Sequence, residues 1–119
     1  MNKTKLVMNS ENSIEKYLPL SESSYFILLL LVEPLHGYGI MQAVDTLTGG
    51  QVVIGPGTLY GALSTLEEEN LVAVDRIEAR RKFYRLTEKG QKVLLAQYQR
   101  LKMMTENGRQ LLSESDLNG

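Results

Sequence analysis

The first apolar block of the chain predicts a buried helix. Residues 25–32 are apolar throughout, and the block lies between Ser21, whose hydroxyl can cap a helix N-terminus, and Pro34, which ends a helix. A helix that is apolar on every side must be covered on every side. Because the block is too short to span a membrane, we expect one side to pack in the core. The other side, with Phe26 and Leu30, is expected to meet a second subunit.

Two further helices are predicted, each with one apolar side. Residues 37–47 predict a helix that the following glycines end, and a third helix begins at Pro56, in the first-turn position where the missing N–H of proline costs nothing. The segment 51–54 between them has the composition of a short strand. Along the third helix, apolar residues recur at the spacing of one helix face: Leu59, Ala62, Leu63 and Leu66.

The second half of the chain predicts a hairpin and a long helix. Residues 71–77 and 82–86 are rich in strand-forming side chains, and only four residues connect them. Thr87 can then cap a helix that runs to about residue 112, although the pattern leaves open whether it continues through Asn107–Gly108. The fold class is therefore mainly α with a small β-hairpin. This order of elements is that of a winged helix–turn–helix followed by a long C-terminal helix.

Composition narrows the chemistry that such a domain could perform. The 119 residues are 43% hydrophobic and 23% charged, which is typical of one globular domain. Without cysteine and with one histidine, the chain has neither a disulfide nor a thiolate site, and we expect no metal and no cofactor. No apolar signal core follows the first lysines, so we expect a cytoplasmic protein without a membrane span.

Charge is distributed unevenly along the chain. The net charge is only −1, yet residues 17–75 contain no lysine or arginine, whereas residues 76–92 contain seven basic and two acidic residues. The basic block coincides with the hairpin and places Arg80, Arg81 and Lys82 at its tip, where a winged helix contacts the DNA backbone. A solvated charged surface is the alternative interpretation of such a block.

Three motifs in this pattern resemble the PadR family of transcriptional regulators. They are residues 26–40 (FILLLLVEPLHGYGI), residues 55–63 (GPGTLYGAL), and residues 80–87 (RRKFYRLT) with Gly90 after them. The resemblance extends from about residue 20 to residue 101 and fits the small type of the family, with a single C-terminal helix. It implies a homodimeric winged-helix protein that binds double-stranded DNA, usually as a repressor of detoxification or multidrug-transport genes.

The resemblance also divides the chain into functional segments. These are a flexible arm at 1–17, a winged-helix DNA-binding domain at 18–87, a C-terminal dimerisation helix at 88–112 and a polar tail at 113–119. The apolar stripe of the last helix could line a ligand pocket or form a dimer seam, and the family favours the seam. The expected dimer residues besides Phe26 and Leu30 are Leu94, Leu95, Tyr98, Leu101 and Met104. A small hydrophobic or phenolic effector could bind at the dimer centre, and the sequence identifies neither it nor the palindromic operator.

The third helix is the expected recognition helix. Gly57 allows close backbone approach at a helix N-terminus whose free N–H groups suit a phosphate, and Thr58, Tyr60 and Ser64 can present hydroxyls to DNA. The helix carries no cation, so base reading is expected to rest on hydroxyls, apolar contacts and DNA shape. Packing on the rim of the core is the alternative for Tyr60, and for His36 a structural role in the turn is favoured over metal binding.

Two other classes of function fit this sequence less well. A winged-helix protein–protein interaction module that binds no DNA would have no need of three cations at the hairpin tip. A small enzyme would need a paired nucleophile and base, which a chain with no cysteine and one histidine does not offer. The sequence therefore favours a DNA-binding regulator.

Overall fold

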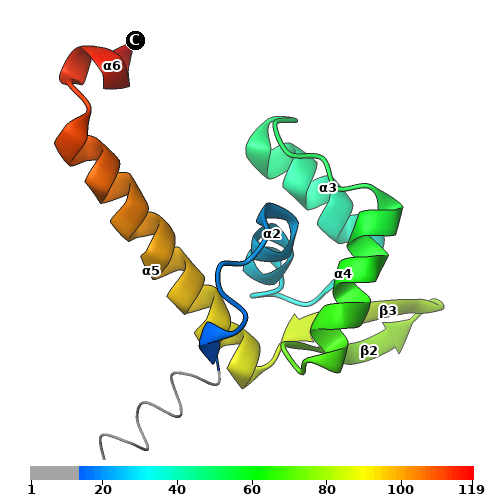
Figure 1. Ribbon diagram of the computed structural model, residues 1–119. Coiled ribbons are helices and arrows are strands. Elements are labelled where there is room, and N and C mark those ends of the chain that lie inside the picture. The colour runs from blue at the N-terminus through cyan, green and yellow to red at the C-terminus, as the bar shows by residue number, and fades with distance from the viewer. Residues whose placement is uncertain (1–13) are drawn as a thin grey trace, which may run out of the picture.

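The computed structural model describes residues 14–119 as a helical body with a projecting hairpin and a long last helix (Figure 1). Residues 1–13, which make up most of the predicted arm, lie outside the described residues. The elements, in chain order, are α2 (Glu22–Leu30), β1 (Leu35–His36), α3 (Gly37–Thr48), α4 (Pro56–Glu68), β2 (Val72–Glu78), β3 (Arg81–Leu86), α5 (Glu88–Leu111) and α6 (Glu114–Asn118).

The helix starts follow the capping residues that the sequence offers. The Ser21 hydroxyl accepts the N–H of Ser24 at the start of α2, and the Thr87 hydroxyl accepts the N–H of Gly90 at the start of α5. Pro56 occupies the first turn of α4, as predicted. These local signals confirm the predicted starts of all three helices.

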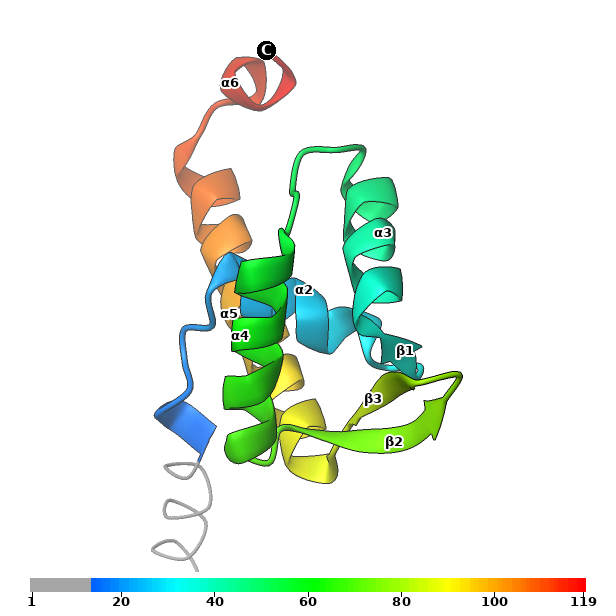
Figure 2. The ribbon, with the colours of Figure 1, turned by 90° about the vertical axis from the view of Figure 1, so that its right-hand side faces the viewer.

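The core is built around α2, which lies between α5 on one side and α3 and α4 on the other (Figures 1 and 2). Ile27 and Leu28 are fully buried, whereas Phe26 and Leu30 are half-buried at the edge of the core. Val32 lies beyond the end of the helix and is exposed. Within the described residues, the apolar block is therefore buried on one side and only partly covered on the other.

A three-stranded antiparallel sheet, in the order β1-β3-β2, replaces the simple hairpin of the prediction. The short β1 pairs with the middle of β3, with Leu35 opposite Tyr84 and His36 opposite Phe83. The predicted strand at 51–54 is wrong: this segment has no strand partner, because the Thr48 hydroxyl accepts the N–H of Val52 and so satisfies the backbone locally.

The hairpin turns within two residues. Glu78 pairs with Arg81, so only Ala79 and Arg80 form the loop, and both have left-handed backbone, with φ of 50° and 65°. A two-residue hairpin of the type I′ kind needs positive φ at both central positions, where glycine and asparagine are preferred. The chain places a cation there instead, so Arg80 lies in the two-residue loop at the tip of the hairpin.

Helix α5 runs without a break through Asn107 and Gly108, which settles the question that the sequence left open. Its first turn packs so closely that a Cβ at Gly90 would collide with the backbone carbonyl of Leu71. Its second half projects away from the body, and α6, capped by Ser113, lies at the far end in the segment predicted to be a polar tail (Figure 1). No helix in residues 14–119 is both long and apolar enough to cross a bilayer.

Candidate nucleic-acid interface

Helix α4 turns one side to the core and the other to solvent. Leu59 and Leu63 are buried in the core, whereas the opposite side of the helix, which carries small and polar residues, is exposed. All four residues predicted to read DNA from this helix are exposed: Gly57, Thr58, Tyr60 and Ser64. The structure thus leaves the predicted recognition surface open to a ligand as large as a duplex.

Tyr60 combines exposure with packing. Its side chain is 50% exposed, yet its ring lies so close to Gly37 of α3 that a Cβ there would be 2.5 Å from the Tyr60 hydroxyl oxygen. Glycine at position 37 therefore provides the space for this ring. Tyr60 therefore packs at the rim of the core and also keeps an exposed side chain, so the two interpretations of this residue are compatible.

The cations of the hairpin fall into two groups. Arg76 is held by its own neighbours: its Nε donates to Glu78 at 2.7 Å and its Nη1 to Asp75 at 3.0 Å, and these two hydrogen bonds raise its pKa. The three cations predicted at the tip, Arg80, Arg81 and Lys82, are exposed and form no ion pair with any residue in 14–119. The second group alone has charge available for a ligand.

His36 joins the hairpin to the helical body. Its Nδ1 accepts the N–H of Gly39 at 3.0 Å and so caps α3, which confirms the predicted structural role of this histidine. Its ring packs edge-on against Phe83 at 5.1 Å between centroids, and its Nε2 is 3.1 Å from Nη1 of Arg81. The helix cap and the ring contact with Phe83 hold the hairpin against the start of α3.

A pocket of 420 Å³ lies between the start of α3, the recognition helix α4 and the hairpin. We call it the wing pocket. Its polar groups are mainly hydrogen-bond donors, which suit an anion rather than a metal, and no three metal-ligating side chains cluster within residues 14–119. Besides Tyr60 and the three tip cations, it is lined by His36, Gly37, Tyr38 and Tyr84. Sequence reasoning assigned none of these last four to a site, because they belong to segments far apart in the chain.

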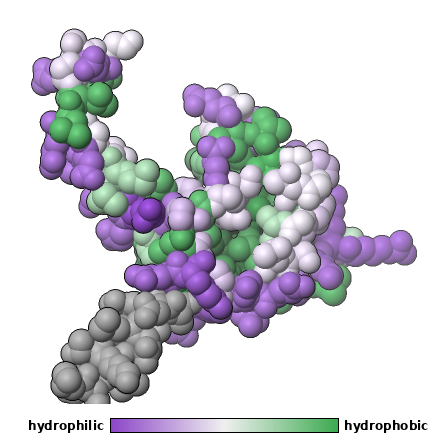
Figure 3. Space-filling model, in the orientation of Figure 1, coloured by the Kyte–Doolittle hydropathy of each residue, from purple (hydrophilic) through white to green (hydrophobic). Residues whose placement is uncertain are grey.

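The residues predicted at a dimer interface differ in burial. Leu94 is buried inside its own protomer, so it is not available to a partner. Leu95, Tyr98 and Met104 are each about half exposed, and Leu101 is half-buried. Green hydrophobic surface also marks the far end of α5 in Figure 3, where Leu111 and Leu112 are exposed.

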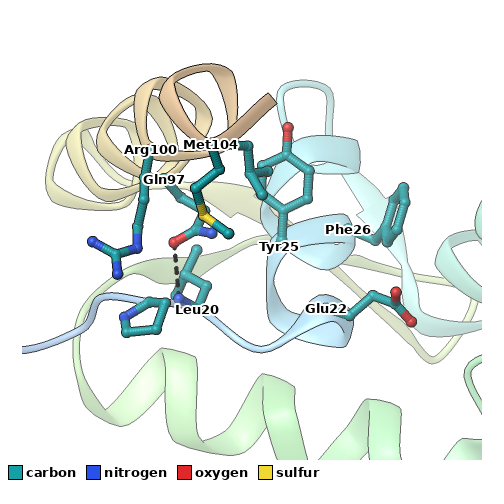
Figure 4. Close-up of a pocket in the computed structure, with 9 residues that line it drawn as sticks. Leu20, Glu22, Tyr25, Phe26, Gln97, Arg100 and Met104 are labelled. Carbon is teal, nitrogen blue, oxygen red and sulfur yellow. Dashed lines mark hydrogen bonds between the residues drawn. The ribbon is translucent and has the colours of Figure 1, made fainter. Parts of the chain in front are cut away.

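A second cavity, of 450 Å³, lies between the start of α2 and the middle of α5 (Figure 4). Its wall is mainly apolar, with Tyr25, Phe26 and Met104 as the large side chains. At its base the buried Gln97 accepts the backbone N–H of Leu20 through Oε1 at 2.9 Å, which ties the segment before α2 to α5.

Three helices, a basic wing and an exposed polar recognition helix define the winged helix–turn–helix class, a class of DNA-binding proteins. Residues 27–96 match the family described as "Transcriptional regulator PadR-like family". The chain belongs to this family, which is one of transcriptional regulators and not of enzymes.

Known proteins agree with this assignment. Transcriptional regulator YqjI of Escherichia coli (strain K12) is 32% identical over 71 residues, which is 60% of this chain and 34% of that protein. The chain spans only 21% to 34% of the length of the curated relatives that it matches. The similarity therefore concerns only a part of those longer proteins.

Two solved structures show the same fold. A transcriptional regulator from Clostridium thermocellum superposes with a TM-score of 0.68 at 26% identity, covering 86% of this chain and 99% of that one. Bacillus subtilis PadR in complex with operator DNA gives a TM-score of 0.58 at 26% identity, covering 66% of this chain and 47% of that one.

Proposed function

We propose that this protein is a homodimeric repressor that binds a palindromic operator in double-stranded DNA. The observation that carries the proposal is the pairing of two surfaces: the exposed polar face of α4 and a wing tip with three cations that have no ion-pair partner within residues 14–119. The complex of Bacillus subtilis PadR with operator DNA supports it by analogy.

The two surfaces have different tasks in this proposal. Thr58, Tyr60 and Ser64 read base edges and groove shape, because hydroxyls discriminate without adding charge. The wing cations bind phosphates, which contributes affinity for any sequence. Specificity therefore comes from α4 and most of the affinity from the wing.

Dimerisation is proposed through α5. A symmetric dimer places two recognition helices about 34 Å apart, one turn of DNA, which is why a palindromic operator is expected. The apolar residues Leu95, Tyr98 and Met104 are each about half exposed, and a cluster of exposed apolar residues is typical of a surface that binds another protein. Sedimentation equilibrium tests this: a monomer at all concentrations would contradict the proposed dimer.

DNA binding is tested by selecting duplexes from a random pool and measuring affinity by gel shift. Arg81→Ala is expected to weaken selected and random duplexes by the same factor, whereas Thr58→Ala is expected to change the ratio between them. If wild-type protein retains no duplex at 50 mM salt, the protein-interaction alternative replaces this proposal. Equal losses on both duplexes for both variants would refute the division of tasks.

We further propose that a small hydrophobic or phenolic effector binds in the cavity beside Tyr25 and Met104, next to the proposed dimer surface. Methionine gives such a wall the adaptability that a ligand of variable shape needs. A thermal-shift screen of phenolic acids and cationic drugs is the test. A stabilising compound is expected to lose its effect in Met104→Ala, and a shift of equal size in that variant would contradict this site.

A further inference from the structure

The wing pocket lies beside the recognition helix because β1 is short. Strand β1 pairs only with residues 83 and 84 of β3, and after His36 the chain turns away into α3. The part of β3 that carries Arg81 and Lys82 is therefore uncovered on this edge. Figure 2 shows the start of α3 directly beside the hairpin, with the wing tip extending past it.

Tyr84 presents a hydrogen-bonding group to this pocket from the interior. The residue is 92% buried, as a relative exposure of 8% implies, and it lines the pocket from the middle of β3. Its hydroxyl forms no hydrogen bond with another side chain or backbone group in residues 14–119, and because no fully buried polar side-chain atom there lacks a partner, this hydroxyl is open to the pocket. Burial raises the pKa of Tyr84, with smaller contributions from Glu67 and Tyr60, so the group stays protonated and can donate. A mostly buried tyrosine that opens an unpartnered hydroxyl onto a pocket can donate to a ligand held there.

A second contact indicates the charge of that ligand. While Nδ1 of His36 accepts the Gly39 N–H, only Nε2 can carry the ring proton, so Nε2 is a donor. Nη1 of Arg81 is also a donor, and the two atoms are 3.1 Å apart. Two neighbouring donors are satisfied together when an oxyanion accepts from both. Arg80 and Lys82 at the same pocket add positive charge.

We infer that the wing pocket holds one phosphodiester group of the DNA backbone, with the Tyr84 hydroxyl donating to a non-bridging oxygen and Arg81 and His36 donating beside it. This inference rests on the proposed function, since it assigns a place to one phosphate of the bound duplex. It makes Tyr84 a buried donor for DNA, although its position in the hairpin pattern is that of a core residue.

The test compares Tyr84→Phe with Tyr17→Phe, a matched loss of a hydroxyl before α2, where Tyr17 donates to Glu69 at 3.4 Å, away from the wing. Fluorescence anisotropy is measured with a labelled random 24-base-pair duplex and with a selected operator, at several salt concentrations. Tyr84→Phe is expected to raise Kd about tenfold or more on both duplexes, because hydrogen bonds to charged groups are strong. The slope of log Kd against log salt should stay unchanged, since tyrosine carries no charge. Tyr17→Phe should bind as the wild type does.

Further readouts separate a phosphate contact from the alternatives. Thermal unfolding of both variants checks that the fold is retained. Methylphosphonate groups, which remove one phosphate charge at a time, are scanned through the operator. At one position per half-site the wild type should fall to the affinity of Tyr84→Phe, and the variant should lose nothing more.

Each outcome is decisive. If the wild type binds no duplex, the proposed function itself fails. If the wild type binds and Tyr84→Phe binds equally well, only the pocket assignment fails. A loss confined to the operator would replace the phosphate with a base contact. If inorganic phosphate raises the melting temperature of the wild type but not of Tyr84→Phe, while both proteins bind DNA equally well, the pocket is a site for free phosphate and not for the backbone.

Discussion

Replacing Lys82 by glutamine should reduce the salt dependence of DNA binding, whereas the same change at Arg76 should not. Both residues are exposed cations of one hairpin, but Arg76 is paired with Asp75 and Glu78 and Lys82 has no ion-pair partner within residues 14–119. Only a cation that neutralises a phosphate releases a counterion on binding. The two variants therefore change the net charge equally and differ in phosphate contacts.

The magnitude follows from the three available cations at the wing tip. If each contacts one phosphate, a dimer makes about six contacts and the slope of log affinity against log salt is about −5.4. From 50 to 200 mM salt, wild-type affinity should then fall about 1,800-fold. Lys82→Gln leaves about four contacts and a slope of about −3.6, so its affinity should fall only about 150-fold.

The assay is fluorescence anisotropy on one duplex of random sequence, with salt as the only variable. Arg76→Gln is the matched control and should keep the wild-type slope to within measurement error. Equal changes of slope in the two variants would refute the reasoning, because the pairing of Arg76 would then have no bearing on which charges meet DNA.

Three predictions concern stability and are read from urea or thermal unfolding. Gly90→Ala should destabilise the protein by about 1–3 kcal/mol or more, because the added methyl group meets the Leu71 carbonyl. Gly108→Ala, in the same helix, has open space around it and should stabilise the protein by up to about 1 kcal/mol. The reverse order of stability would contradict the close packing at Gly90. Gln97→Ala should cost about 1–3 kcal/mol because it leaves the N–H before α2 without its partner, and an unchanged midpoint would count against that bond. Ala79→Asn should stabilise by about 0.5–1 kcal/mol, since asparagine tolerates left-handed backbone; a loss would mean that the turn is not what limits the hairpin.

Local signals account for the parts of the fold that the sequence predicted. The caps at Ser21 and Thr87 and the proline at position 56 act within one helical turn, so their effect can be recognised without knowing the rest of the molecule. The strand Leu35–His36 could not be recognised in this way. It is two residues long, and it is a strand only because β3, almost fifty positions further along, pairs with it.

The candidate site, like the fold, could be predicted only where local signals define it. The wing cations and the exposed face of α4 follow from local charge and helical periodicity. The wing pocket does not, because it needs the start of α3 and the end of the hairpin to be brought together. Tyr84 illustrates the difference: alternation along the strand marks it as interior, and nothing local shows that its hydroxyl reaches a hollow.

Helix α5 has a consequence for how the protein behaves at low abundance. Its far end projects away from the helical body, and Leu111 and Leu112 there are exposed. If that surface is buried only by a second copy, part of the folding free energy is gained on association, and the melting temperature should rise with protein concentration. The amount of DNA-competent protein in a cell would then vary with the square of its dilute monomer concentration, so a modest change in expression would produce a larger change in operator occupancy.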